Sequence, residues 1–274
     1  MNKSNFQDCE GHDRQTYGLP YGQDQLIEAL LKINLNLIYV NISGNAVAMP
    51  WAAKVPAIVQ GWFVGSEAGE ALARVLAGDV NPSGKLPFTW YARLEDCGAH
   101  ATGSYPGIWR EDHQIIDETY KEDIFVGYRW TNKQKIKPLF PFGHGLSYTT
   151  FQVSNLRADK KEMTVDDQLT ITADVKNTGS LAGAEVLQLY ISDTKSSQPR
   201  PVKELKGFKK VYLEPGEMQQ VRFTIDRSAL SFYDEKTGGW IAEPGEFVAM
   251  VSNSSAPSRN VIRFILSIKT LQTK

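Results

Sequence analysis

The feature that most limits the fold of this chain is a series of short strand patterns in its C-terminal part. Four segments have the alternating or continuous apolar residues typical of β-strands, at 169–175, 186–191, 220–225 and 247–251. Turn signals separate them, including two copies of Glu-Pro-Gly-Glu at 214–217 and 243–246. Short strands at this spacing predict an all-β sandwich of the immunoglobulin or fibronectin type III kind over residues 151–274.

The first part of the chain has a different pattern, in which helix and strand signals alternate. Apolar residues recur at helical spacing after Pro20, and two apolar runs follow at 37–42 and 57–63. Such runs are typical of strands that are buried on both faces of a parallel sheet. A helix that begins at Ser66 and ends at Gly78 comes next. This order predicts an α/β layer, but two or three strands are too few to complete one, so we expect part of a larger domain.

Between these parts lies a stretch rich in Gly, Pro, Tyr and Trp with little periodicity. Residues 124–128 form its one strand-like run. Long irregular segments of this kind are usually functional loops or connections that pack on a neighbouring domain. We therefore expect three regions: an α/β portion at 1–92, a connecting segment at 93–150 that packs on it, and the sandwich at 151–274.

Charge and composition exclude several classes of function. The 30 Lys and Arg residues nearly balance the 31 Asp and Glu residues, for a formal net charge of -1, so we expect no nucleic-acid partner. No apolar run approaches the roughly 20 residues of a membrane-spanning helix. None of the four His residues has a partner at the spacing of metal ligands, so we expect neither a metal nor another cofactor.

Several motifs resemble those of glycoside hydrolase family 3, which contains β-glucosidases and β-xylosidases. They occur in the order of that family and cover nearly the whole chain: EGHDR at 10–14, GWFVGSEAG at 61–69, NPSGKLPFT at 81–89, PFGHGLSYTTF at 141–151 and RPVKELKGF at 200–208. The resemblance implies three domains in a full-length enzyme. A β/α barrel with an Asp nucleophile comes first, then an α/β sandwich with the acid/base Glu, then a fibronectin type III-like domain.

By this resemblance the chain starts partway into the α/β sandwich. The expected partners are the N-terminal β/α barrel and an oligosaccharide or glucoside substrate. The full-length protein is expected to be periplasmic or secreted.

Retaining glycoside hydrolysis requires two carboxyl groups about 5–5.5 Å apart, one as nucleophile and one as proton donor. The resemblance implies that only the proton donor lies in this chain. Glu10 is the single Glu of the 10–14 motif and is our candidate for it. The alternatives are a donor before Met1 and a structural role in which Glu10 pairs with Arg14.

Three further residues are candidates for substrate binding. Glu67 lies in the first turn of a predicted helix, where the helix dipole alone favours an acid; the alternative is that its turn faces the cleft and supports the sugar. Trp109 and Tyr120 lie in the connecting segment and could stack on sugar rings or, as such residues more often do, pack between domains.

The sequence therefore predicts the C-terminal portion of a β-glucosidase-like hydrolase that is inactive alone. Two other hypotheses remain: a non-catalytic carbohydrate-binding or scaffold module, and the second subunit of a split enzyme. Saccharide binding by the isolated chain would favour the binding module.

Overall fold

A computed structural model describes residues 16–268 and divides the chain into two compact units. The first unit contains residues 16–80, Trp90–Lys121 and Pro138–Phe140. The second unit contains Asn81–Thr89, Glu122–Lys137 and residues 141–268. The chain therefore leaves the second unit twice, after Thr89 and after Lys137, and returns to it at residue 141 before the sandwich strands begin.

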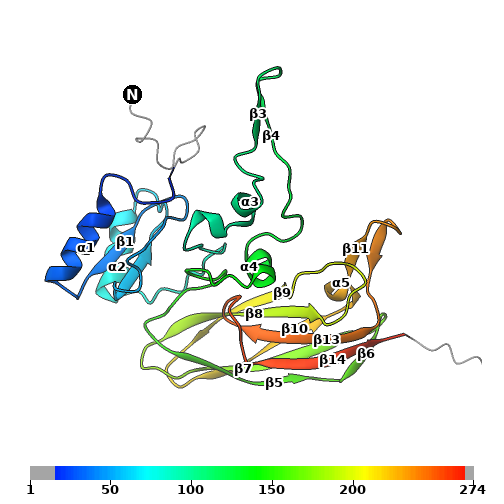
Figure 1. Ribbon diagram of the computed structural model, residues 1–274. Helices are drawn as coiled ribbons and strands as arrows, with labels where there is room; N and C mark the ends of the chain where they lie inside the picture. Colours follow the sequence, from blue (N-terminus) through cyan, green and yellow to red (C-terminus); the bar gives the residue numbers. More distant parts are fainter. Residues whose placement is uncertain (1–15, 269–274) are drawn as a thin grey trace, which may run out of the picture. The chain divides into compact units, whose positions relative to one another are not determined.

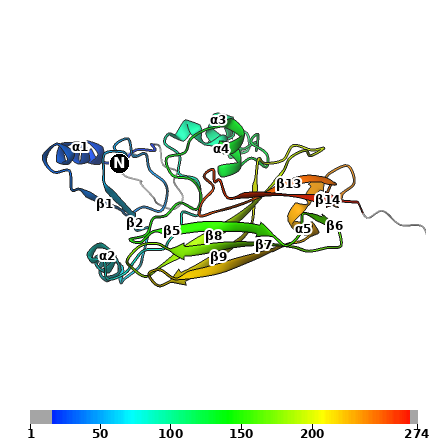
Figure 2. The same ribbon diagram turned by 90° about the horizontal axis from the view of Figure 1, so that it is seen from below.

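The first unit begins with a small α/β layer. Its elements are helix α1 (Gln23–Ile33), strands β1 (Ile38–Asn41) and β2 (Ala57–Gln60), and helix α2 (Ala68–Ala77). The two strands pair in parallel, and Figure 2 shows them between α1 and α2. Gly78 ends α2 with a φ of 86°, a left-handed conformation in which glycine pays no Cβ penalty. The predicted order of helix, strand, strand and helix is confirmed.

The prediction that the first strand is buried on both faces is wrong for part of its length. Ile38 is 53% exposed and Ile42, just after the strand, is 52% exposed. No residue of α2 is buried either. The reason is that β1 and β2 form a sheet of only two strands, so these side chains lack the neighbours that a wider sheet would supply.

The rest of the first unit has only short elements joined by loops. It contains a 3-10 turn, η2 (Leu94–Asp96), the short helix α3 (Gly98–Ala101), and a hairpin of β3 (Ile108–Arg110) and β4 (Ile115–Asp117). Trp90 is almost fully buried and its indole Nε1 donates to the Val47 carbonyl oxygen at 2.7 Å. This hydrogen bond ties Trp90, just before the connecting segment, to the loop after β1.

The second unit is a β-sandwich (Figure 1). One sheet has the order β10-β7-β5 and the other β6-β14-β13-β8-β9. The strands are β5 (Phe151–Ala158), β6 (Glu162–Thr164), β7 (Leu169–Asn177), β8 (Gly183–Asp193), β9 (Glu204–Leu213), β10 (Met218–Ile225), β13 (Gly245–Ser252) and β14 (Val261–Ser267). A short helix, α5 (Arg227–Leu230), and a hairpin of β11 (Phe232–Asp234) and β12 (Gly239–Ile241) join β10 to β13. The four strands predicted from the sequence are all present.

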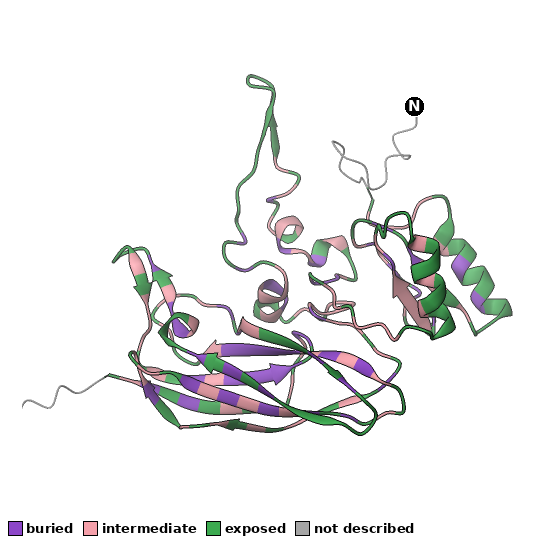
Figure 3. Ribbon diagram, turned by 180° about the vertical axis from the view of Figure 1, so that it is seen from behind, coloured by how far each residue is buried: buried purple, intermediate pink, exposed green. Residues whose placement is uncertain are grey.

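The core of the sandwich lies between the two sheets. Strand β7 alternates strictly between buried and less buried residues, and its side chains Leu169, Ile171, Ala173 and Val175 are fully buried. Figure 3 shows this alternation as bands of colour along the strands. A half-buried strand with period two is the expected pattern for a sheet that packs on one face. The predicted fold class, an α/β portion followed by a fibronectin type III-like sandwich, is confirmed.

Strand β8 is different, because five consecutive residues from Leu187 to Ile191 are buried. Helix α4 (Tyr128–Gln134) belongs to the same unit and covers the outer side of this strand. The Tyr128 ring meets the Tyr190 ring edge-on with centroids 5.7 Å apart. The strand predicted at 124–128 is wrong, since Gly127 has a φ of 62° and α4 begins at Tyr128.

Candidate functional site

The carboxyl ends of β1 and β2 carry a buried polar network. Asn41, the last residue of β1, donates from its amide nitrogen to Gln60 Oε1 at 2.6 Å and to Ser43 Oγ at 2.7 Å. Tyr39 donates its hydroxyl to Asn41 Oδ1 at 2.7 Å, and burial followed by the Asp24 charge raises the pKa of Tyr39 to about 12. Ligand sites of open parallel sheets lie at this end of the strands, so the network supports the loops of a candidate site.

The loop that leaves β2 adopts a constrained path. Gly61 donates its backbone N–H to the Asn41 carbonyl oxygen, and a Cβ at this position would lie 2.6 Å from Ile42 Cδ1. Trp62 follows with a φ of 55°, which a residue with a bulky side chain rarely adopts. Strain of this kind persists where the surroundings impose it, often at functional sites. Phe63 is largely exposed, so the loop presents an apolar side chain to the outside.

Glu67 lies at the end of this loop as the N-cap of α2. Its backbone oxygen accepts from Ala71 N, but its side chain makes no capping hydrogen bond and is exposed. The position at a helix N-terminus stabilises a carboxylate by about 0.3–1 kcal/mol. Glu67 is therefore placed after the carboxyl end of a strand, with its carboxylate available to solvent.

Of the other predicted site residues, the structure describes Trp109 and Tyr120, and neither is joined to Glu67. Glu10 lies outside the described residues. Trp109 belongs to β3 and is 55% exposed, and Tyr120 is 77% exposed. In the part of the chain that the structure describes, no hydrogen bond or ring contact links either aromatic residue to Glu67.

Asn41, Ser43 and Gln60 were missed by the sequence analysis. The signal that could have found them is a polar amide at the end of each apolar strand run, where parallel strands bring their carboxyl ends together. Their pairing still required the register of β1 on β2, in which Asn41 lies opposite Gln60.

The family is decided by comparison with known proteins. The glycosyl hydrolase family 3 C-terminal domain matches residues 1–148, which is more than half of the chain. The chain belongs to glycosyl hydrolase family 3. The fibronectin type III-like domain that follows it in this family 3 chain matches residues 185–255.

The relatives of this family 3 chain are longer than the chain itself. Beta-glucosidase BoGH3A of Bacteroides ovatus is 53% identical over 96% of this chain, which is 35% of that protein. Thermostable beta-glucosidase B of Acetivibrio thermocellus is 43% identical over 90% of the chain and 32% of its own length. The crystal structure of a β-glucosidase from Kluyveromyces marxianus in complex with glucose matches with a TM-score of 0.83 at 43% identity, covering 94% of this chain and 30% of that one. This chain thus spans about a third of the length of the relatives it matches.

Two of the family 3 motifs meet in the second unit as a polar network. Asn81 accepts at Oδ1 from Ser147 Oγ and from Tyr148 N, and donates its amide nitrogen to the Ala182 carbonyl oxygen. Lys85 Nζ lies 2.7 Å from Glu185 Oε1 and 2.7 Å from the Gly145 carbonyl oxygen. The 81–89 and 141–151 motifs are therefore joined to each other and to β8.

The pair of Lys85 and Glu185 is well enclosed. The Lys85 side chain is 12% exposed and the Glu185 side chain is 8% exposed. Glu185 also accepts from Val186 N at 2.8 Å and from the Asn253 amide at 3.2 Å. Since a buried charge is costly unless it is paired and hydrogen-bonded, these contacts explain how both ions are tolerated. Burial, and then the Lys85 charge, lower the pKa of the nearby His144.

The motif at 200–208 forms a second cluster of charges. Arg200 bonds to Glu204 Oε2 at 2.6 Å and to Asp193 Oδ2 at 3.2 Å, and Arg129 lies 3.5 Å from the other Glu204 oxygen. Arg129 belongs to α4, so this cluster also fastens the connecting segment to the sandwich. These motif residues support the fold and are not placed as reacting groups.

Lys203 in the same motif is a buried amine with carbonyl partners. Its Nζ donates to the Ser255 carbonyl oxygen at 2.6 Å and lies 5.0 Å from the centroid of the Tyr190 ring. Burial lowers the pKa of Lys203 to about 8. Because the unfolded chain binds this proton more tightly than the folded protein does, stability should rise as the pH increases from the folded pKa towards the unfolded one.

Within residues 16–268, no three His, Cys, Asp or Glu side chains come together as ligands for a metal ion. No helix in that range is both long and apolar enough to cross a bilayer.

Proposed function

We propose that this chain is the C-terminal portion of a retaining β-glucosidase that acts on β-linked glucosides or related oligosaccharides, and that it does not hydrolyse them by itself. The observation that carries the proposal is the sequence similarity to a β-glucosidase, which covers 96% of this chain and 35% of the length of that protein. Retaining hydrolysis requires a nucleophile and a proton donor about 5–5.5 Å apart. The resemblance to the family assigns the nucleophile to a barrel that precedes the region matched here.

The exposed apolar surface of the first unit supports the proposal that another domain packs on it. Several large apolar side chains of the α/β layer are more than a third exposed, among them Leu26, Leu30, Ile33, Leu35, Ile38, Ile42 and Phe63. Soluble proteins rarely leave such surface uncovered unless another protein or domain packs on it. The partner proposed here is the N-terminal β/α barrel domain.

Within the complete enzyme we assign a catalytic role to one carboxylate, that of Glu10. Glu10 is the proposed acid/base: it protonates the leaving-group oxygen and then deprotonates the water that hydrolyses the glycosyl-enzyme intermediate. Glu67 is proposed to support the sugar site from the N-terminus of α2. Trp109 and Tyr120 have exposed rings that can stack on the apolar face of a sugar.

The test is hydrolysis of an aryl β-glucoside by the chain alone and after addition of a barrel polypeptide from a related β-glucosidase. We expect no turnover from the chain alone and turnover from the mixture. Robust hydrolysis by the isolated chain would refute the assignment of the nucleophile to the barrel domain. A titration of the isolated chain with gluco-oligosaccharides is the companion measurement, because tight binding without the barrel would favour a carbohydrate-binding module instead.

A further inference from the structure

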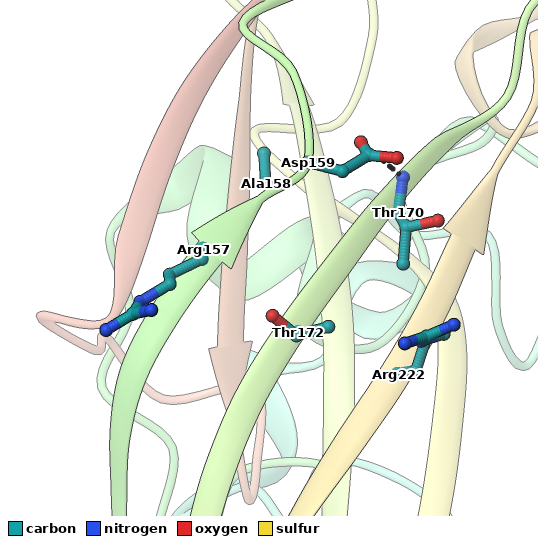
Figure 4. A pocket seen from close by; sticks show the side chains of 6 residues that line it. All are labelled: Arg157, Ala158, Asp159, Thr170, Thr172 and Arg222. Atoms are coloured by element: carbon teal, nitrogen blue, oxygen red, sulfur yellow. Dashed lines mark hydrogen bonds between the residues drawn. The ribbon is translucent and has the colours of Figure 1, made fainter.

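The outer face of the three-stranded sheet contains a shallow concavity of about 300 Å³. It lies on β5, β7 and β10, on the side of the sheet opposite the sandwich core. Figure 4 shows the residues that line it, which are Arg157, Ala158, Asp159, Thr170, Thr172 and Arg222.

Three of these residues form one row across the sheet. Thr172 of β7 lies opposite Arg157 of β5 on one side and opposite Arg222 of β10 on the other. Neighbouring strands are roughly 4.8 Å apart, so the two arginine Cα atoms flank Thr172 at a separation of about 10 Å. Figure 4 shows Thr172 between the two guanidinium groups. Both arginine side chains are long and exposed, so they can turn over the threonine to meet a ligand there.

Neither guanidinium group has an acidic partner. Arg129 and Arg200 of the second unit are paired with Glu204, but no ion pair or hydrogen bond involves the Arg157 or Arg222 side chain among residues 16–268. The carboxylate that lines the concavity, that of Asp159, accepts from the Thr170 backbone N–H at 2.9 Å.

Asp174, two residues along β7, accepts from the amides of Asn155 and Gln220 at 2.8 and 3.3 Å. Asp159 and Asp174 on this face thus accept hydrogen bonds from protein groups, whereas the side-chain N–H donors of Arg157 and Arg222 have no acceptor among the described residues.

We propose that this concavity binds an oxyanion carried on a saccharide, either a carboxylate or a sulfate group. Arg157 and Arg222 donate to it from two sides, and the Thr172 hydroxyl donates from the floor. Guanidinium groups match such anions because their N–H donors are planar and fork-shaped. The polar row of Gln220 and Asp174 continues along the same face and offers hydrogen bonds to the hydroxyl groups of neighbouring sugars. The choice of a saccharide rests on membership of a glycoside hydrolase family and not on the proposed catalysis.

General electrostatic attraction does not account for such binding. The formal net charge of the chain is -1, so a polyanion gains nothing from the protein as a whole. An interaction with an acidic glycan must therefore come from a local group of donors.

The test is native electrophoresis of the full chain in gels that contain polygalacturonate, dextran sulfate or neutral dextran, at about 0.1 M salt to screen distant charges. We expect retardation by at least one acidic glycan and none by neutral dextran. Arg157→Gln and Arg222→Gln should each weaken binding about three- to fivefold, the effect of losing one exposed ion pair. Asp159→Asn keeps an oxygen for Thr170 N, removes the nearby negative charge, and should strengthen binding.

Arg259→Gln is the matched control. Arg259 is also exposed and has no ion pair within the described range, but it lies in the loop between β13 and β14, away from this row. The Arg259→Gln chain should bind acidic glycan as the unchanged chain does. Absence of retardation by both acidic glycans, or equal weakening by Arg259→Gln, would overturn the proposal. Equal affinity for free inorganic sulfate would overturn the requirement for a saccharide, and unchanged melting temperatures show that each variant is folded.

Discussion

Replacing Lys85 by methionine tests whether the enclosed ion pair holds the motif segments on the sandwich. The substitution keeps the length of the side chain but removes the ammonium group that lies 2.7 Å from Glu185 and 2.7 Å from the Gly145 carbonyl oxygen. Loss of one partner of a buried ion pair costs about 3–5 kcal/mol. Because Glu185 keeps its hydrogen bonds to Val186 N and the Asn253 amide, we expect the lower end, about 3 kcal/mol.

Differential scanning calorimetry of the full chain measures this loss. A folded unit of this size changes its melting temperature by about 2–4 °C per kcal/mol, so Lys85→Met should lower the transition of the second unit by about 6–12 °C. The double variant Lys85→Met/Glu185→Leu should recover part of the loss, because it leaves no unpaired buried charge.

Arg263→Met is the control within the same unit. Arg263 pairs with Glu246, but the two side chains are 65% and 44% exposed, so the change should cost less than about 1 kcal/mol. A Lys85→Met chain that melts with the unchanged protein, or an Arg263→Met chain that loses as much, would refute the reasoning from burial.

Three further predictions follow from the site and its motifs. The free energy of unfolding of the unchanged chain, relative to that of Lys203→Met, should rise by roughly 2 kcal/mol from pH 7 to pH 10, because the pKa of Lys203 is about 8 in the folded protein and near 10.4 in the unfolded chain. Guanidinium unfolding measures this difference, and a difference that does not change with pH would contradict the lowered pKa. In the mixture with a barrel polypeptide, Glu10→Gln should slow hydrolysis of an alkyl β-glucoside by about 100-fold or more. Added azide, which needs no base, should then yield glucosyl azide from an aryl glucoside, and a variant with full activity would exclude Glu10 as the acid/base. In that mixture Trp109→Ala should raise KM by about threefold to tenfold through loss of stacking. Replacement of Trp240, which is also exposed, by Ala should not raise KM, and equal effects would argue against a sugar contact.

The sequence predicted those parts of the fold that depend on local pattern. The alternation of Leu169 to Val175 identified β7, and the Glu-Pro-Gly-Glu turn placed the start of β10, where Gly216 has a φ of 80°. The strand predicted at 124–128 failed because Phe125 is buried by tertiary contacts, while Gly127 turns the chain into α4. Apolar residues without periodicity do not distinguish a strand from a loop that packs on another element.

The site was less accessible to prediction than the fold. The 81–89 and 200–208 motifs were found in the sequence, but their physical role depends on partners far along the chain, such as Glu185 for Lys85 and Ser255 for Lys203. No local pattern records such pairs. The roles of Glu10, Glu67, Trp109 and Tyr120 stay predictions, because they depend on what faces them in the complete enzyme.

Segments of the chain that precede β5 belong to the second unit, so the sandwich strands cannot be moved to another protein without them. A gene exchange that moved only residues 151–268 to another protein would carry Glu185 but leave behind Lys85, whose amine neutralises it. It would also strip α4 and the ring of Tyr128 from β8, uncovering Tyr190. The sandwich therefore depends on two upstream segments, the one that contains Lys85 and the one that contains α4. We expect gene recombination to keep all three segments together.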